Sequence, residues 1–321
     1  MKKNNIRTIT ALTALLALAA CGDRLQTSEP VELRFTSGLQ MQTRAAYVST
    51  QNTQIVSGEK VYAWVDEAVP SPGTPVEYVH AWELTADGSG ALNGTRQNYP
   101  NSGYPVNAYA LHGDFGSAIT AGTTTFPTAA LTHSVGTNQG TQAALAKSDL
   151  LWASGTGLVR QTAAHPLTFS HLLAKIEVYL VAGTGTTDTE LESATVTIQN
   201  TIPTATVTLS KSAAPTVAVT TDPVSDITCF AQTETDQTVT IGGVPQPAHR
   251  FAEAVIVPQA VNNDFIKVSL GATAYYTAKV NTTFAAGNRY SYYVVVNKAG
   301  ISLSTTITAW GDGGTQVVNA K

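Results

Sequence analysis

The sequence predicts an all-β fold, on three observations. Charged residues make up only 12% of the chain, so hydroxyl groups carry much of its polarity, which suits strands that are exposed on one face. Short runs in which apolar and polar residues alternate recur along the chain, and this is the period of a half-buried strand. Turn-forming residues separate the runs, at Gly183–Gly185, Gly242–Gly243, Gly287–Asn288 and Lys298–Gly300.

The strand patterns are clearest after residue 165. Alternating runs occupy 175–180, 194–198, 207–209, 239–241, 266–270, 290–296 and 301–309. The unbroken apolar run Ala254–Val257 predicts a strand covered on both faces. Short, evenly spaced strands of this kind predict a β-sandwich, and we assign residues 166–321 to a C-terminal sandwich domain.

The preceding part of the chain, 45–165, predicts a second β-rich domain with long loops. One strand is predicted there because four apolar residues alternate with their neighbours, namely Val76, Tyr78, Trp82 and Leu84. The stretch 85–165 is looser, and Ala143–Leu151 predicts a short helix with Ala144, Leu145 and Leu151 on one face. We place the boundary between the two domains near His165–Pro166.

The first 20 residues have the pattern of a lipoprotein signal peptide. A basic start (Lys2, Lys3, Arg7) precedes the apolar stretch Ile9–Ala20, which is too short to span a bilayer as a helix. Cys21 follows the small residues Ala19 and Ala20, so we predict that it is the lipid attachment site, carrying acyl chains such as palmitate. The alternative is an ordinary signal peptide with an incidental cysteine. Without a second apolar run, we expect an outer membrane lipoprotein that is anchored without crossing the membrane.

Composition and motifs argue against several function classes. The formal charge of −4 falls to −7 when the three basic residues of the signal are removed. The remaining sequence has no cluster of basic residues, which argues against nucleic acid as a partner. Cys229, the only other cysteine, is expected to be a buried small residue. His165 and His171 lack ligands at metal spacing, and we expect His171 to pack or hydrogen-bond inside the sandwich. No catalytic motif is present, so we predict a protein without enzymatic activity, cofactor or metal.

Residues 31–41 form the most regular alternation in the chain. Five large apolar residues share one parity, namely Val31, Leu33, Phe35, Leu39 and Met41. Burying them is worth roughly 7–15 kcal/mol before entropy. The stretch Thr43–Ala46 follows this run. A protease that cuts after arginine could hydrolyse the bond between Arg44 and Ala45 there. If this strand were removed, apolar walls and unpaired backbone groups would be exposed for another strand to fill.

The last alternating segment is a candidate replacement for that strand. It contains Ile301, Leu303 and Ile307 on one parity, and a neighbouring subunit would donate it. Alternation alone favours a simpler alternative, in which both segments are permanent strands of their own domains.

Several motifs, in this order, resemble the fimbrillin superfamily of Bacteroidetes, the type V pilins with their Mfa-like members. They are the lipobox at Cys21, the strand that ends in Thr43–Ala45, and the segments Ser148–Ala153, Leu167–Val178, Ala254–Gln259, Ala286–Tyr292 and Ile307–Trp310. Each motif is weak alone, whereas the ordered set covers most of the chain after the signal.

The resemblance implies two transthyretin-like β-sandwich domains in tandem. It implies that residues 21–44 are a propeptide, that an arginine-specific protease cuts at Arg44, and that a C-terminal strand of the next subunit fills the vacated groove. The partners would be other fimbrial subunits, self or accessory, and a host or bacterial surface ligand, in adhesion or biofilm formation. The alternative from the residues alone is a monomeric lipoprotein that binds glycan through loops of residues 85–140. Tyr99, Tyr104 and Tyr109 would be exposed there to stack on sugars, or would instead pack a loop onto the sandwich.

Overall fold

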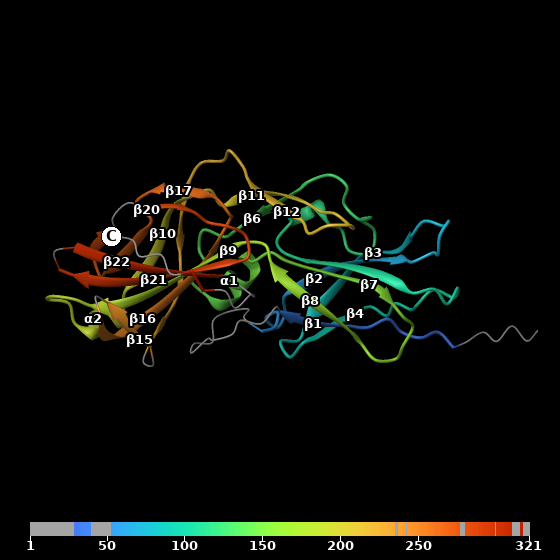
Figure 1. The fold of residues 1–321 in the computed structure, drawn as a ribbon, viewed down its shortest axis with the longest axis horizontal. Helices are drawn as coiled ribbons and strands as arrows, with labels where there is room; N and C mark the ends of the chain where they lie inside the picture. Colours follow the sequence, from blue (N-terminus) through green and yellow to red (C-terminus); the bar gives the residue numbers. More distant parts are fainter. Residues whose placement is uncertain are drawn as a thin grey trace, which may run out of the picture.

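The computed structural model describes residues 29–39, 53–234, 237–241, 243–276, 280–298, 300–309 and 315–316. Strands dominate this part of the chain, which confirms the all-β prediction (Figure 1). Its helical elements are α1 (Gln142–Ser148), α2 (Asp188–Glu192) and the 3-10 turn Gly116–Ala118.

Seven strands close into a barrel that occupies one end of the molecule (Figure 1). Around the barrel their order is β1 (Phe35–Leu39), β4 (Ala91–Gly94), β3 (Val76–Ala86), β2 (Lys60–Glu67), β5 (Val106–His112), β7 (Leu151–Leu158) and β8 (His165–His171). The resemblance implies a sandwich here. The closed arrangement follows from β1, which is antiparallel to β4 and parallel to β8 and so joins the two edges that would otherwise stay open.

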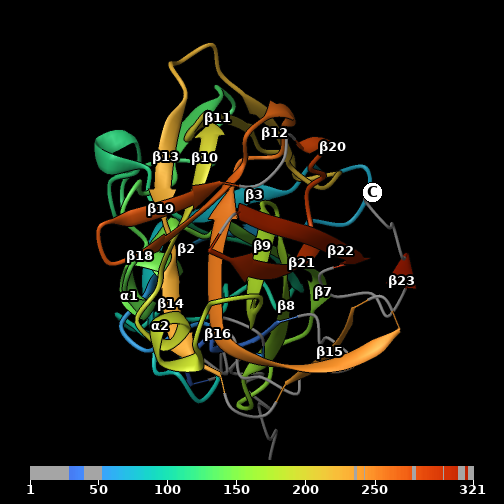
Figure 2. The same cartoon turned by 90° about the vertical axis from the view of Figure 1, so that its left-hand side faces the viewer.

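The other end of the molecule is built around a large mixed sheet, which Figure 2 views from that end. Its strands are β14 (Phe230–Thr233), β16 (Val244–Ile256), β9 (Ala174–Ala182), β21 (Asn288–Asn297), β22 (Gly300–Ala309) and β23 (Thr315–Gln316), with β15 (Thr238–Ile241) paired to β16. Beside it lie the sheet of β13 (Ser225–Thr228), β10 (Thr195–Thr201), β18 (Ile266–Leu270) and β19 (Thr273–Tyr276), and the pair β17 (Ala260–Asn263) and β20 (Val280–Thr283).

A third small sheet crosses between the two ends. It joins β12 (Thr216–Val219) and β11 (Thr204–Thr208) to β6 (Leu131–Ser134), which comes from the stretch predicted as the N-terminal domain. One buried apolar cluster likewise contains Trp64 and Tyr109 of the barrel together with Val196 and Val294 of the other sheets. The predicted boundary falls at the start of β8, a barrel strand. The division into two domains therefore stays a prediction.

Two strands depart from simple alternation. In β3, Val79 and Trp82 both belong to the barrel core although their parities differ, because a bulge with Ala81 at φ +36° shifts the phase between them. In β9 both faces are buried, and its charged residues are paired: Lys175 Nζ lies 2.6 Å from Glu253 Oε2, and the Ser291 hydroxyl donates to Glu177 at 3.0 Å. The sequence predicted a polar face for this strand.

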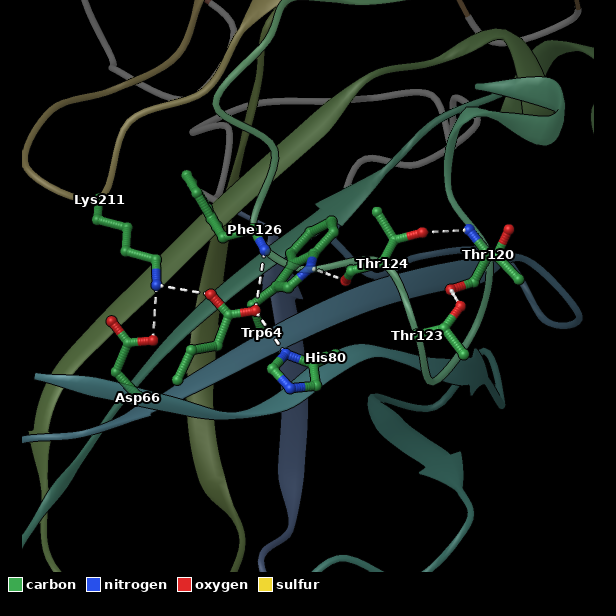
Figure 3. Close-up of polar contacts among 9 residues, drawn as sticks. Trp64, Asp66, His80, Thr120, Thr123, Thr124, Phe126 and Lys211 are labelled. Atoms are coloured by element: carbon green, nitrogen blue, oxygen red, sulfur yellow. Dashed lines mark hydrogen bonds and ion pairs between the residues drawn. The ribbon is translucent and has the colours of Figure 1, made fainter.

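Lys211 ties the turn between β11 and β12 to the barrel (Figure 3). Its Nζ donates to Asp66 Oδ1 at 2.6 Å and to Glu77 Oε2 at 2.9 Å, and it lies 5.0 Å from the centroid of the Phe126 ring. Burial alone would raise the pKa of the Glu77 carboxyl, but hydrogen bonds from His80, Lys211 and the Phe126 backbone outweigh it and lower that pKa. We call this group the Lys211 latch.

We expect Lys211→Ala to lower the free energy of unfolding by about 1–3 kcal/mol at neutral pH, because the buried Asp66 carboxylate loses its charged partner. Lys147→Ala is the matched control, since it removes an exposed pair with Asp114 and should cost under about 1 kcal/mol. Urea denaturation measures the free energy of unfolding of both variants. Equal losses would contradict a stabilising role for the Lys211 latch.

The destabilisation caused by Lys211→Ala should also depend on pH. Glu77 has a lowered pKa in the folded protein, so its stabilising contribution is complete above the ordinary pKa of 4.5 and is lost as the pH falls through the folded value. The stability difference between wild type and Lys211→Ala should therefore shrink in acid. A difference that is constant between pH 7 and pH 3 would contradict this assignment.

Candidate strand-exchange groove

The segment 31–39 lies in the barrel with one face buried, as its alternation predicts. Leu33, Phe35 and Leu39 are 1%, 2% and 4% exposed, and Val31 is half-buried. Arg34 on the other parity is exposed. The Phe35 ring packs on the indole of Trp82, with their centroids 5.8 Å apart. The burial of this face makes the segment part of the barrel core.

Backbone hydrogen bonds hold the segment from both sides. On the β4 side, the N–H groups of Leu33 and Ser37 donate to the carbonyls of Gln97 and Gly90 at 2.8 and 2.7 Å. On the β8 side, residues Phe35–Leu39 pair in parallel with His165–Phe169. Removing the segment would leave two strands with unpaired backbone edges and an apolar wall between them. We call the space that it fills the β1 groove.

Ser37 is the residue that sequence reasoning missed in this groove. It is 6% exposed and shares the buried parity, and its hydroxyl donates to the Gly90 carbonyl at 3.4 Å. Gly90 has φ +109°, and a Cβ there would lie 3.3 Å from the Ser37 carbonyl oxygen. The backbones at Ser37 and Gly90 therefore approach closely, and a side chain at position 90 would be crowded. Because serine is polar, the pattern of alternating apolar residues did not indicate that Ser37 would be buried.

The segment is also held at its N-terminal end. Arg96 donates to the Pro30 carbonyl at 3.2 Å and Arg160 to the Glu29 carbonyl at 2.5 Å. The remaining predicted residues at this end of the chain, Cys21, Met41, Arg44 and Ala45, lie outside the described residues. Lipidation and cleavage there stay predictions.

The candidate donor segment lies in β22, which contains Ile301, Leu303 and Ile307. This strand pairs with β21 along its whole length, from Gly300 to Ala309. On its other side, within the described residues, Ile307 and Thr308 pair with β23. It can act as a donor only by leaving β21, so this role stays a prediction.

Other sequence expectations concern single side chains. Cys229 is a free, buried thiol, and burial raises its pKa. His171 is buried as expected, with Nδ1 2.8 Å from Asp149 Oδ2. Of the two alternatives for the tyrosines, packing holds for Tyr99 and Tyr109, which are each 4% exposed because they pack into the two cores. Tyr104 is 39% exposed.

Within the described ranges, no three histidine, cysteine or acidic side chains come together as metal ligands would. No helix in this part of the chain is long and apolar enough to cross a membrane.

The profile of the fimbrillin-like family matches residues 43–310 of the chain. Two solved structures share its fold: a proposed cell adhesion protein from Bacteroides uniformis and another from Bacteroides ovatus. The first has a TM-score of 0.56 and 18% identity and covers 87% of this chain and 98% of its own. The second has a TM-score of 0.56 and 16% identity, with coverage of 88% and 98%. No curated protein matches the sequence.

We expect Phe35→Ala to lower the free energy of unfolding by about 3–5 kcal/mol, because it empties a fully buried aromatic site in the barrel core. Thr36→Ala, one residue away on the other parity, should change it by less than about 1 kcal/mol. Chemical denaturation of the uncleaved chain measures both. Similar values for the two variants would show that β1 does not support the barrel.

Proposed function

Because this chain belongs to the fimbrillin-like family, we propose that it is a structural or accessory subunit of a surface fimbrium, assembled by protease-triggered strand exchange. It would be exported as an outer membrane lipoprotein on Cys21, would serve adhesion or biofilm formation, and would have no enzymatic activity. Its partners would be other fimbrial subunits, self or accessory, an arginine-specific protease and a surface ligand.

The observation that carries this proposal is the position of β1. The strand is bonded on both sides inside the barrel, it comes first among the described strands, and Arg44 follows its last residue by five positions. A single cut at Arg44 would therefore separate a barrel strand from the rest of the barrel without cutting any of the other strands that the structure describes.

Such a cut would remove the covalent tether that favours β1 over a competing strand from another subunit. Before the cut, the short connection between β1 and Thr53 keeps the strand at an effective concentration of about a millimolar or more at its own groove. After the cut, only non-covalent contacts hold it, and a strand from a neighbouring subunit competes on equal terms. The released segment would stay at the membrane through Cys21, while the subunit becomes free to leave.

The donor would be the segment with Ile301, Leu303 and Ile307 from a neighbouring subunit. Its apolar alternation suits a groove that buries every second residue. Among the described strands, β22 has a ten-residue ladder with β21 and a two-residue ladder with β23. This supports the choice over a strand with long ladders on both sides, which would have to break more backbone hydrogen bonds to leave its sheet.

The alternative, glycan capture through Tyr99, Tyr104 and Tyr109, loses its structural basis. Only Tyr104 of the three is exposed, so these rings do not form a common stacking surface.

We expect an arginine-specific protease to convert the purified wild-type chain into a ladder of stable oligomers. Arg44→Ala should remain monomeric, because β1 stays tethered in its groove. Native gels and mass spectrometry of the products measure the outcome.

Arg34→Ala is the matched control for this experiment. Arg34 is exposed, but its carbonyl accepts the His165 N–H at 2.8 Å within the barrel, so the folded barrel protects that bond from the protease and the variant should form the same ladder as wild type. Wild-type protein that is cut cleanly at Arg44 and stays monomeric would rule out strand exchange.

A further inference from the structure

A cleft of about 630 Å³ lies beside the bulge of β3, at the end of β4. Its lining includes Tyr78 and Trp82 from β3 and Asn93, Gly94 and Gln97 from β4 and the segment after it. Its volume is within the range of small-molecule sites, about 300–1,000 Å³. The bulge residue Ala81, with φ +36°, places a strained backbone next to it, and bulges of this kind are common beside binding sites.

Two polar groups in the wall of the cleft lack hydrogen bonds. The hydroxyl of Tyr78 and Nε1 of Trp82 are buried and have no partner among the described residues. Trp82 is 5% exposed, and its Nε1 would lie 2.7 Å from a Cβ on Gly94. A side chain at position 94 would collide with the indole nitrogen and with the Glu83 carbonyl, so this part of the cleft wall requires a glycine. Such unmet groups cost free energy, and a ligand's hydroxyls would recover it once a small side-chain rotation opens either group to the cleft.

The chemistry of the remaining lining points to an uncharged ligand. The charged side chains are already paired: Glu83 lies 2.9 Å from Lys60, and the His80 imidazole lies 2.8 Å from Glu77. Asn93 and Gln97 carry amides, which both donate and accept hydrogen bonds as sugar hydroxyls do. The ring of Tyr78 adds an apolar body for the C–H groups of a sugar.

We propose that this cleft binds a neutral oligosaccharide. The inference rests on the proposed function at the cell surface and names the class of ligand that the protein would bind there. The cleft also touches the β1 groove, because Trp82 packs on Phe35 and the Gln97 carbonyl accepts the Leu33 N–H. Binding is therefore tested in the uncleaved full chain, where β1 fills the groove in every sample.

The test begins with the full chain, in detergent, on an array of immobilised neutral, sialylated and sulfated oligosaccharides. We expect binding to neutral glycans that is insensitive to salt. The tightest neutral binder is then titrated by calorimetry against the wild type and the variants. Asn93→Ala and Gln97→Ala should each weaken binding about 3- to 10-fold, because each loses one or two neutral hydrogen bonds.

Tyr78→Phe separates a binding role from a structural one. Its hydroxyl makes no hydrogen bond within the described protein, so we expect an unfolding midpoint that is unchanged or raised and binding that is about 3- to 10-fold weaker. Asn101→Ala, an exposed asparagine outside the cleft, is the matched control and should bind like wild type.

No binding on the array, binding that requires an acidic sugar, or binding that all three cleft variants leave intact would each overturn the proposal. The binding assay uses the uncleaved chain, whereas the oligomer assay uses the cleaved chain. Failure of one proposal is therefore distinguishable from failure of the other.

Discussion

A sheet can close into a barrel only if every strand has a neighbour on each side, and in this protein β1 satisfies that condition for β4 and β8. The two strands that it joins lie far apart in the chain, so no local hairpin can replace it. The closing strand is also joined to the rest of the barrel by one short connection that contains Arg44. The integrity of the barrel thus depends on a segment that one hydrolysed bond would free.

The parts of the molecule are joined by more than a linker. A shared apolar cluster, the β6–β11 ladder and the Lys211 latch connect the barrel to the sheets at the other end. In a fimbrial subunit, the groove and the donor segment would lie in these two parts. Tension along a fibre would then pass through packed side chains and ion pairs, which resist it better than a flexible connection would.

Alternation in the sequence predicted much of this architecture, because a strand with one buried face has apolar residues at every second position. Strands lie within or around three of the predicted runs: Phe35–Leu39 within 31–41, Ile266–Leu270 at 266–270, and Asn288–Asn297 around 290–296. Alternation failed where long-range partners decide burial. No residue near Lys175 in the sequence indicates that Glu253 lies opposite it. Tyr99 lies in a loop and Tyr109 in β5, and both are buried by residues distant in the chain. Ser37 was missed because its polar side chain interrupts the apolar alternation, although its hydroxyl is buried and donates to the Gly90 carbonyl.

The central claim is that the leading strand is a temporary occupant of its groove, and the N-terminus of the assembled protein tests it most directly. Intact-mass and N-terminal peptide spectrometry of polymers sheared from the cell surface should find subunits that begin at Ala45. Polymers whose subunits still begin at an acylated Cys21 would contradict the account, because β1 would then remain tethered to the barrel in the finished fibre.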